Sequence, residues 1–176
     1  MKLRNEIEPK ILQAEEIYPQ VLNLIYEYDN AWDNEDDDKC EEVARKLSEL
    51  TGKEITEDDL FEHWEVNGDD QIAFGFSLAE PIVLSTPLSK DELFEIVQRI
   101  SNPEHDDLKE IDENAPFPKD LMWWRLNDYY IGLLELNLKL PKKFSVASLF
   151  YRQKVNGEYV EYTPEEILEK ILGVMK

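Results

Sequence analysis

Residues 7–32 read IEPKILQAEEIYPQVLNLIYEYDNAW, and this stretch decides the fold class of the N-terminal part of the chain. Its apolar side chains recur at alternating steps of four and three residues, which predicts a helix with one apolar face over about seven turns. Pro19 is expected to kink or split that helix, because proline removes a backbone donor and crowds the preceding turn. The recurring residues are Ile7, Ile11, Ala14, Tyr18, Val21, Ile25, Tyr28 and Trp32.

The apolar stripe of this first helix has two interpretations. Asn5 and Glu8 resemble a capping pair at its start. A narrow stripe would favour a coiled-coil seam, and the chain would then be a structural or oligomeric component that pairs through its first helix. Four further apolar residues widen the stripe and favour a helix buried in the core. They are Leu12, Ile17, Leu22 and Leu24.

Local signals predict four more helices. Residues 37–50 carry an apolar face that ends at Gly52, and Thr56 begins a short acidic helix. Two capping pairs open the others, and each places Glu three residues after a hydroxyl side chain. These pairs are Ser89 with Glu92 and Thr163 with Glu166.

Three segments predict strands. Residues 71–78 and 133–140 alternate apolar with small or polar side chains, which is typical of a strand with one buried face. Asn156-Gly157 between 150–155 and 158–162 predicts a β-hairpin. We expect residues 101–118, which are acidic and contain three prolines, to form a long surface loop.

The order of these elements predicts the fold class α+β. A helix-rich N-terminal two-thirds would pack on a small, mainly antiparallel sheet, with a C-terminal hairpin followed by a helix. The length of 176 residues fits a single domain spanning 1–176.

Charge is distributed very unevenly along the chain. Residues 29–113 hold 27 Asp and Glu against 7 Lys and Arg, a balance of −20 out of a total of −21. Such a charge makes direct binding to nucleic acid or to an anionic membrane improbable. With 42% hydrophobic residues, the charge sits on a folded body rather than on a disordered tail.

Cysteine use and hydropathy indicate a cytoplasmic protein. Cys40 is the only cysteine, so no intrachain disulfide is possible. The first residues lack the apolar run of a secretory signal, and no stretch approaches the roughly 20 apolar residues of a membrane span.

Catalytic and cofactor motifs are absent from the sequence. His63 and His105 stand far apart and neither belongs to a His-Glu-x-x-His arrangement. The Asp-rich loop that starts at Asp33 has Asp38 where an EF-hand needs glycine and Ala44 where it needs glutamate. We therefore predict no cofactor and no metal site, and an enzyme is the less favoured class. The alternative is a metal-assisted enzyme that uses carboxylates with His63 or His105.

The acidic segment supplies the candidate partner-binding residues. We expect the carboxylates at 33 and 35–38 to steer a cationic partner towards the surface. Replacing residues 36–38 with lysine should then slow association and leave stability nearly unchanged. Trp64, flanked by two glutamates, is the candidate for a closer contact. Trp32 and Trp64 are also in phase with apolar helix faces, which favours core positions. The candidates are Asp33, Glu35, Asp36, Asp37, Asp38, Glu62, Trp64 and Glu65.

These observations favour a non-catalytic acidic protein that binds a basic protein partner. Small size, acidity, an α+β pattern and the lack of catalytic motifs resemble the immunity proteins that neutralise bacterial toxins, although no motif of that class is matched residue by residue. The resemblance implies an immunity- or antitoxin-like inhibitor whose partner is a basic protein such as a nuclease toxin, acting as a monomer or dimer.

Overall fold

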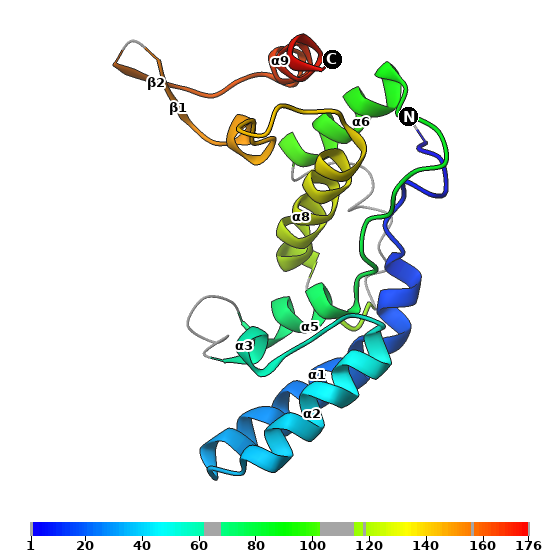
Figure 1. The fold of residues 1–176 in the computed structure, drawn as a ribbon, viewed down its shortest axis with the longest axis vertical. Helices are drawn as coiled ribbons and strands as arrows, with labels where there is room; N and C mark the ends of the chain where they lie inside the picture. The colour runs from blue at the N-terminus through cyan, green and yellow to red at the C-terminus, as the bar shows by residue number, and fades with distance from the viewer. Residues whose placement is uncertain (1, 62–67, 103–114, 118, 156, 176) are drawn as a thin grey trace. The chain divides into compact units, whose positions relative to one another are not determined.

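The computed structural model describes residues 2–61, 68–102, 115–117, 119–155 and 157–175 (Figure 1). The chain divides into two compact units, each assembled from separate segments. Unit 1 comprises Met1–Pro9, Glu80–Ile111 and Leu126–Lys176, and unit 2 comprises Lys10–Ala79 and Asp112–Arg125. The expectation of a single domain stays a prediction.

Unit 2 is built on an antiparallel pair of helices. Helix α1 spans Ile11–Asp33 and helix α2 spans Asp37–Thr51, and the two lie side by side in Figure 1. The predicted stripe of α1 is confirmed from Ala14 to Tyr28, whose members are buried in a helix that packs on α2 and α5, but at its end Ala31 is buried in place of the predicted Trp32. The apolar face proposed as a coiled-coil seam is thus covered within the unit. Pro19 lies inside α1 without splitting it.

The ends of these helices follow local chemistry. Helix α1 begins at Ile11 and not at the predicted capping pair, since Lys10 is its N-cap and makes no side-chain cap. Gly52 ends α2 with a left-handed φ of 71°, as predicted from its position. The short helix α3 (Glu57–Leu60) opens with a capping box between Thr56 and Asp59.

The strand predicted over 71–78 is wrong, because this segment forms helix α5 (Asp69–Ser77). Ala73 and Ser77 are buried together with the apolar residues of the alternating pattern, which is a helical distribution. The Ser77 hydroxyl donates to the Ala73 carbonyl at 2.7 Å, so its polar group is satisfied within the helix. Tyr18 of α1 donates to Asp70 at 2.6 Å and ties the two helices together.

Helix α8 spans Lys119–Asn137, and its residues up to Arg125 belong to unit 2. The predicted strand over 133–140 is therefore wrong as well. Buried residues recur at helical steps of three and one from before the predicted strand into its first two positions, so the helical pattern continues into that segment. These residues are Leu126, Tyr129, Tyr130, Leu133 and Leu134.

Asn137 at the end of α8 fixes the extended segment that leads to α6. Its amide nitrogen donates to the carbonyls of Ile82 and Leu133, both at 2.9 Å, and its oxygen accepts from the Leu84 N–H at 2.7 Å. One side chain thereby satisfies backbone groups of a segment that has no strand partner of its own.

Two capped helices form much of unit 1. Helix α6 (Lys90–Ser101) and helix α9 (Pro164–Val174) pack against each other, and both predicted capping boxes are confirmed. A 3₁₀ turn, Ala147–Phe150, precedes the hairpin.

The predicted hairpin is confirmed. Strand β1 (Gln153–Val155) pairs antiparallel with strand β2 (Glu158–Val160), with Lys154 opposite Tyr159 and Gly157 at a φ of 92° in the turn. All three residues of β2 are exposed, so most of the described core comes from the helices. The coarse class is confirmed: a helix-rich chain with a small antiparallel sheet.

The N-terminal segment is held in unit 1 by two ion pairs with α6. Arg4 Nε lies 2.6 Å from Glu92 Oε1, and Arg99 Nη1 lies 2.8 Å from Glu8 Oε2. The Arg99 side chain is 4% exposed and also donates to the Tyr130 hydroxyl at 2.6 Å. Burial opposes its charge, but these partners raise the pKa of Arg99 above its ordinary value. Within the described parts of the chain, no helix is both long and apolar enough to cross a membrane.

Candidate functional site

The negative charge of the chain belongs mostly to unit 2. This unit holds 23 Asp and Glu against 7 Lys and Arg, a balance of −16, whereas unit 1 holds 17 against 12, a balance of −5. The surplus found along the sequence is therefore gathered on one compact body of packed helices. Such a concentration produces a local field that an even distribution would not.

Five of the predicted partner-binding residues cluster where α1 turns into α2. Asp33 is the last residue of α1, Glu35 lies in the turn, Asp36 is the N-cap of α2, and Asp37 and Asp38 occupy its first turn. All five are exposed. We call these five residues the acidic tip.

Three acids of the acidic tip stabilise α2. The Lys39 N–H donates to Asp36 Oδ1 at 3.1 Å, which satisfies a donor that the helix leaves open. Asp37 and Asp38 face the positive end of the helix dipole. Because Asp36 is a helix cap, we expect the reversal of 36–38 to lower stability, in contrast to the expectation drawn from charge alone.

The other two acids have no such structural role. Asp33 lies at the negative end of α1, whose last turn has no basic residue to balance it. Glu35 has a φ of 55°, a left-handed conformation that is costly for a residue with a side chain. Helix formation alone would favour neither residue at its position. They are the charges of the tip that local structure does not explain.

The cations of the helical pair are engaged away from the tip. Lys39 pairs with Glu27 at 3.9 Å and with Glu42 at 3.3 Å, and Lys46 pairs with Glu42 at 2.6 Å. Hydrogen bonds from Lys46 and Lys39 lower the pKa of Glu42. Among the described residues, no ion pair reaches Asp33, Glu35, Asp37 or Asp38. The tip therefore presents uncompensated charge.

An exposed aromatic pair adjoins the acidic tip. Trp32, which its phase places on the core face of α1, is 38% exposed, and Phe61 is 47% exposed. Their ring centroids lie 5.1 Å apart with the planes at 73°. We call these two residues the aromatic corner. Sequence patterns missed Phe61, because its contact with Trp32 joins two elements that no local spacing relates.

The charges of carboxylates from α1 and α3 act on Tyr28, which packs beneath this corner. Tyr28, one turn before Trp32, is 1% exposed and stacks on it with the ring planes at 14°. Burial and the nearby Cys40, Glu57, Asp29 and Asp58 raise the pKa of Tyr28 to about 12. Asp29 lies one turn before Trp32, and Glu57 and Asp58 lie one turn before Phe61.

Cys40 of α2 is chemically quiet. The thiol is buried, and burial followed by the charges of Glu57, Asp37 and Asp36 raises its pKa. A protonated, enclosed thiol is a poor nucleophile and a poor metal ligand.

The remaining predicted site residues lie outside the described residues. These are Glu62, Trp64 and Glu65, together with His63 and His105 of the enzyme alternative. In the part of the chain that the structure describes, no three His, Cys, Asp or Glu side chains converge as a metal site would require.

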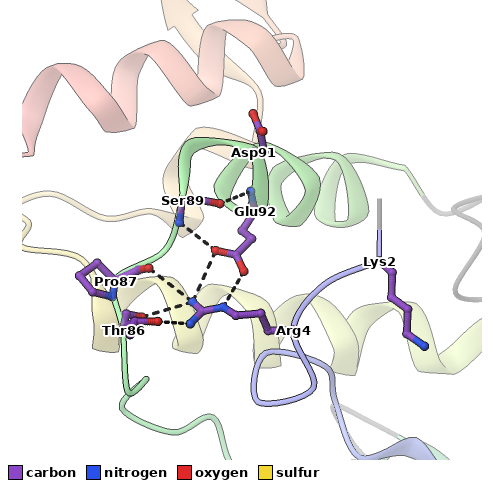
Figure 2. Close-up of a pocket in the computed structure, with 7 residues that line it drawn as sticks. All are labelled: Lys2, Arg4, Thr86, Pro87, Ser89, Asp91 and Glu92. Atoms are coloured by element: carbon purple, nitrogen blue, oxygen red, sulfur yellow. Dashed lines mark hydrogen bonds and ion pairs between the residues drawn. The ribbon is translucent and has the colours of Figure 1, made fainter.

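Unit 1 contains an open depression of about 440 Å³ at the start of α6 (Figure 2). Its polar groups bind one another. Arg4 donates to Glu92, to Thr86 Oγ1 and to the carbonyls of Thr86 and Pro87, and the Ser89 capping box satisfies the N–H groups of Ser89 and Glu92. Figure 2 shows Lys2 extending away from this network. Because Arg4 is already used and the carboxylates of Asp91 and Glu92 also line the depression, it is a poor anion site.

No protein-family model matches the chain, and no curated protein or solved structure is significantly similar to it. The acidic tip and the aromatic corner are thus the features from which function has to be argued.

Proposed function

We propose that this chain is a non-catalytic binding protein that captures a basic protein partner through the acidic tip and the aromatic corner of unit 2. Its action resembles that of an immunity protein or antitoxin, in which an acidic surface covers the cationic cleft of a toxin such as a nuclease. The observation that carries the proposal is the contact of two exposed aromatic rings beside carboxylates that no described cation neutralises.

The two parts of this surface contribute in different ways. Uncompensated carboxylates steer an oppositely charged partner and raise its association rate constant towards ~10⁸–10⁹ M⁻¹s⁻¹ at low salt. Aromatic side chains supply most of the binding energy in many interfaces once the surrounding contacts exclude water. A charged rim around an aromatic centre fits both roles.

The structural weakness of Asp33 and Glu35 supports the same function. Residues that oppose local stability persist where binding needs them, because a site selected for function need not be optimal for folding. Asp33 and Glu35 are therefore the best charges for a test, since Asp36, Asp37 and Asp38 also serve α2.

The test uses the full chain to capture partner proteins and compares two variants, each with two acidic residues replaced by lysine. Asp33→Lys with Glu35→Lys changes the tip, whereas Glu135→Lys with Glu169→Lys makes the same change in net charge at exposed positions of α8 and α9. A protein with a pI above about 9 should be retained by the parent and by the control variant. Once purified, that protein should lose its activity when the parent is added.

Association kinetics then decide whether the tip is the contact. We expect the tip variant to associate several-fold more slowly than the parent at low salt, and the difference to shrink at ~150 mM salt because the Debye length falls to about 8 Å. Equal slowing by both variants would mean that only net charge matters. Full retention of the partner and unchanged rates in the tip variant would remove the acidic tip from the interface.

A further inference from the structure

We propose that the aromatic corner receives an arginine side chain of the partner, an inference that rests on the function proposed above. The corner offers two ring faces at nearly right angles, since the planes of Trp32 and Phe61 meet at 73° and their centroids are 5.1 Å apart. Both rings are partly exposed. This arrangement leaves aromatic surface for a group that stacks.

Aromatic faces beside carboxylates select a cation. The face of an aromatic ring carries negative electrostatic potential and attracts a cation within about 6 Å of its centroid. Acidic residues flank both rings in the chain: Asp33 follows Trp32 directly at the end of α1, and Glu57 and Asp58 lie in α3, which ends one residue before Phe61. Their influence reaches the base of the corner, because Glu57, Asp29 and Asp58 all raise the pKa of the buried Tyr28. An anionic or neutral aromatic partner would lack this complementarity.

The geometry favours arginine over lysine. A guanidinium group is planar and weakly hydrated, so it stacks on one ring while its edge donates to a carboxylate. A lysine ammonium is a compact, strongly hydrated charge that gains less from a flat aromatic face. The corner provides a face and adjacent carboxylates together, and only the guanidinium uses both at once.

The corner is also held in place before binding. Tyr28 is fully buried and stacks parallel to Trp32, which restricts the orientation of the exposed indole. The Tyr28 hydroxyl has no hydrogen-bond partner among the described residues. The ring thus serves as packing beneath Trp32 and is not fixed there by a polar contact. Preorganised aromatic groups lose less conformational freedom when a ligand orders them.

The experiment compares two fluorescent peptides of equal length and charge, one with arginines and one with lysines at the same positions between glycines and serines. Fluorescence anisotropy at ~20 mM salt measures their affinity for the full chain. We expect the parent to prefer the arginine peptide by about 5-fold, a preference of the size that cation–π contacts provide.

Variants assign this preference to the corner. Phe61→Leu keeps an apolar side chain but removes the ring, and Trp32→Leu does the same for the indole. Both should bind the two peptides equally. Trp124→Leu is the matched control, because Trp124 is an exposed tryptophan of α8 that is outside the corner. This control should keep the preference, and thermal melting should confirm that each variant is folded.

The outcomes separate this inference from the proposed function. Equal binding of the two peptides by the parent, with an affinity that falls as salt rises, would overturn the arginine contact and leave an acidic surface that binds any cation. A preference that survives in Phe61→Leu and Trp32→Leu would also overturn it, by placing the arginine elsewhere. A lack of salt-dependent binding by either peptide would count against the acidic tip and thus against the proposed function.

Discussion

Two single charge reversals at the acidic tip should have opposite effects on stability. Asp33→Lys places a cation at the negative end of α1, whose last turn has no basic residue, and removes the like-charge pair that Asp33 makes with Asp29 four residues earlier. The dipole effect contributes about 0.3–1 kcal/mol and relief of the repulsion about 0.2–0.5 kcal/mol. The variant should therefore be more stable than the parent by about 0.5–1.5 kcal/mol.

Asp36→Lys makes the same change in net charge but removes the cap of α2. The hydrogen bond from the Lys39 N–H to Asp36 Oδ1, at 3.1 Å, is lost, which costs about 0.5–2 kcal/mol. A lysine at the positive end of α2 adds about 0.3–1 kcal/mol of destabilisation. The two variants should thus differ by roughly 3 kcal/mol although their net charge is identical.

Urea unfolding followed by far-UV circular dichroism at low salt measures this difference. With a slope of about 2 kcal/mol per molar urea, the midpoints of Asp33→Lys and Asp36→Lys should lie about 1.5 M apart, on either side of the parent. Both variants should slow association with a cationic partner, because each removes a steering charge. If both midpoints move in the same direction by the same amount, net repulsion determines stability and the argument from helix ends fails.

Three further variants test other parts of the structure. Glu35→Gly should raise the free energy of unfolding by roughly 0.5–1 kcal/mol in urea titrations, because glycine adopts a φ of 55° without strain; a loss of stability would show that the Glu35 side chain makes a stabilising contact. Burial opposes the charge of Glu92, but hydrogen bonds from Ser89 and Arg4 keep its pKa below the usual value. The charged Glu92 side chain therefore stabilises the fold fully above about pH 4.3, the usual pKa of glutamate, and this stabilisation disappears as the pH falls through the lower pKa of the folded state. Glu92→Gln should accordingly lower stability by about 1–2 kcal/mol at pH 7 and by much less near pH 3, and a pH-independent difference would contradict this. Arg99→Met should cost about 3–5 kcal/mol in urea titrations by removing the buried cation beside Glu8, whereas Arg45→Met at an exposed pair should stay within about 0.5 kcal/mol; equal effects would refute a role for burial.

Local chemistry made several elements predictable from the sequence. The capping boxes at Ser89 and Thr163 and the hairpin at Asn156-Gly157 depend on side chains within a few residues of the backbone groups they satisfy. Such signals are little affected by the rest of the fold. The long stripe of α1 was equally clear, because its period persists through many turns.

The two wrong strands show where local patterns fail. Residues 71–78 and 133–140 alternate over a short distance only, and a helix buried on a wide face produces the same pattern by chance. In α5 the buried Ala73 and Ser77 lie at the positions that a strand would have exposed. In α8 the exposed Leu136 and the helical spacing upstream of Leu133 outweigh the alternation.

The candidate site was only partly predictable. Charge counting identified Asp33 and Glu35 as members of an acidic surface, since exposure of carboxylates is the normal outcome. It did not separate them from Asp36, whose role depends on the exact residue at which α2 begins. The aromatic corner depends on a contact between Trp32 and Phe61 across two helices, and such tertiary contacts leave no periodic signal in one sequence.

The ion pairs of the N-terminal segment affect the order in which the two units fold during synthesis. Arg4 and Glu8 meet partners 88 and 91 residues later in the chain, so a ribosome adding about 5–20 residues per second needs roughly 4–18 s to supply them. During this interval Leu3 and Ile7, which end up buried, have no completed core to enter. The helical pair α1 and α2 needs only neighbours in sequence and is ready much earlier. Nascent chains on one messenger would therefore display their most strongly repelling part first, which keeps them apart while the later core is still being translated.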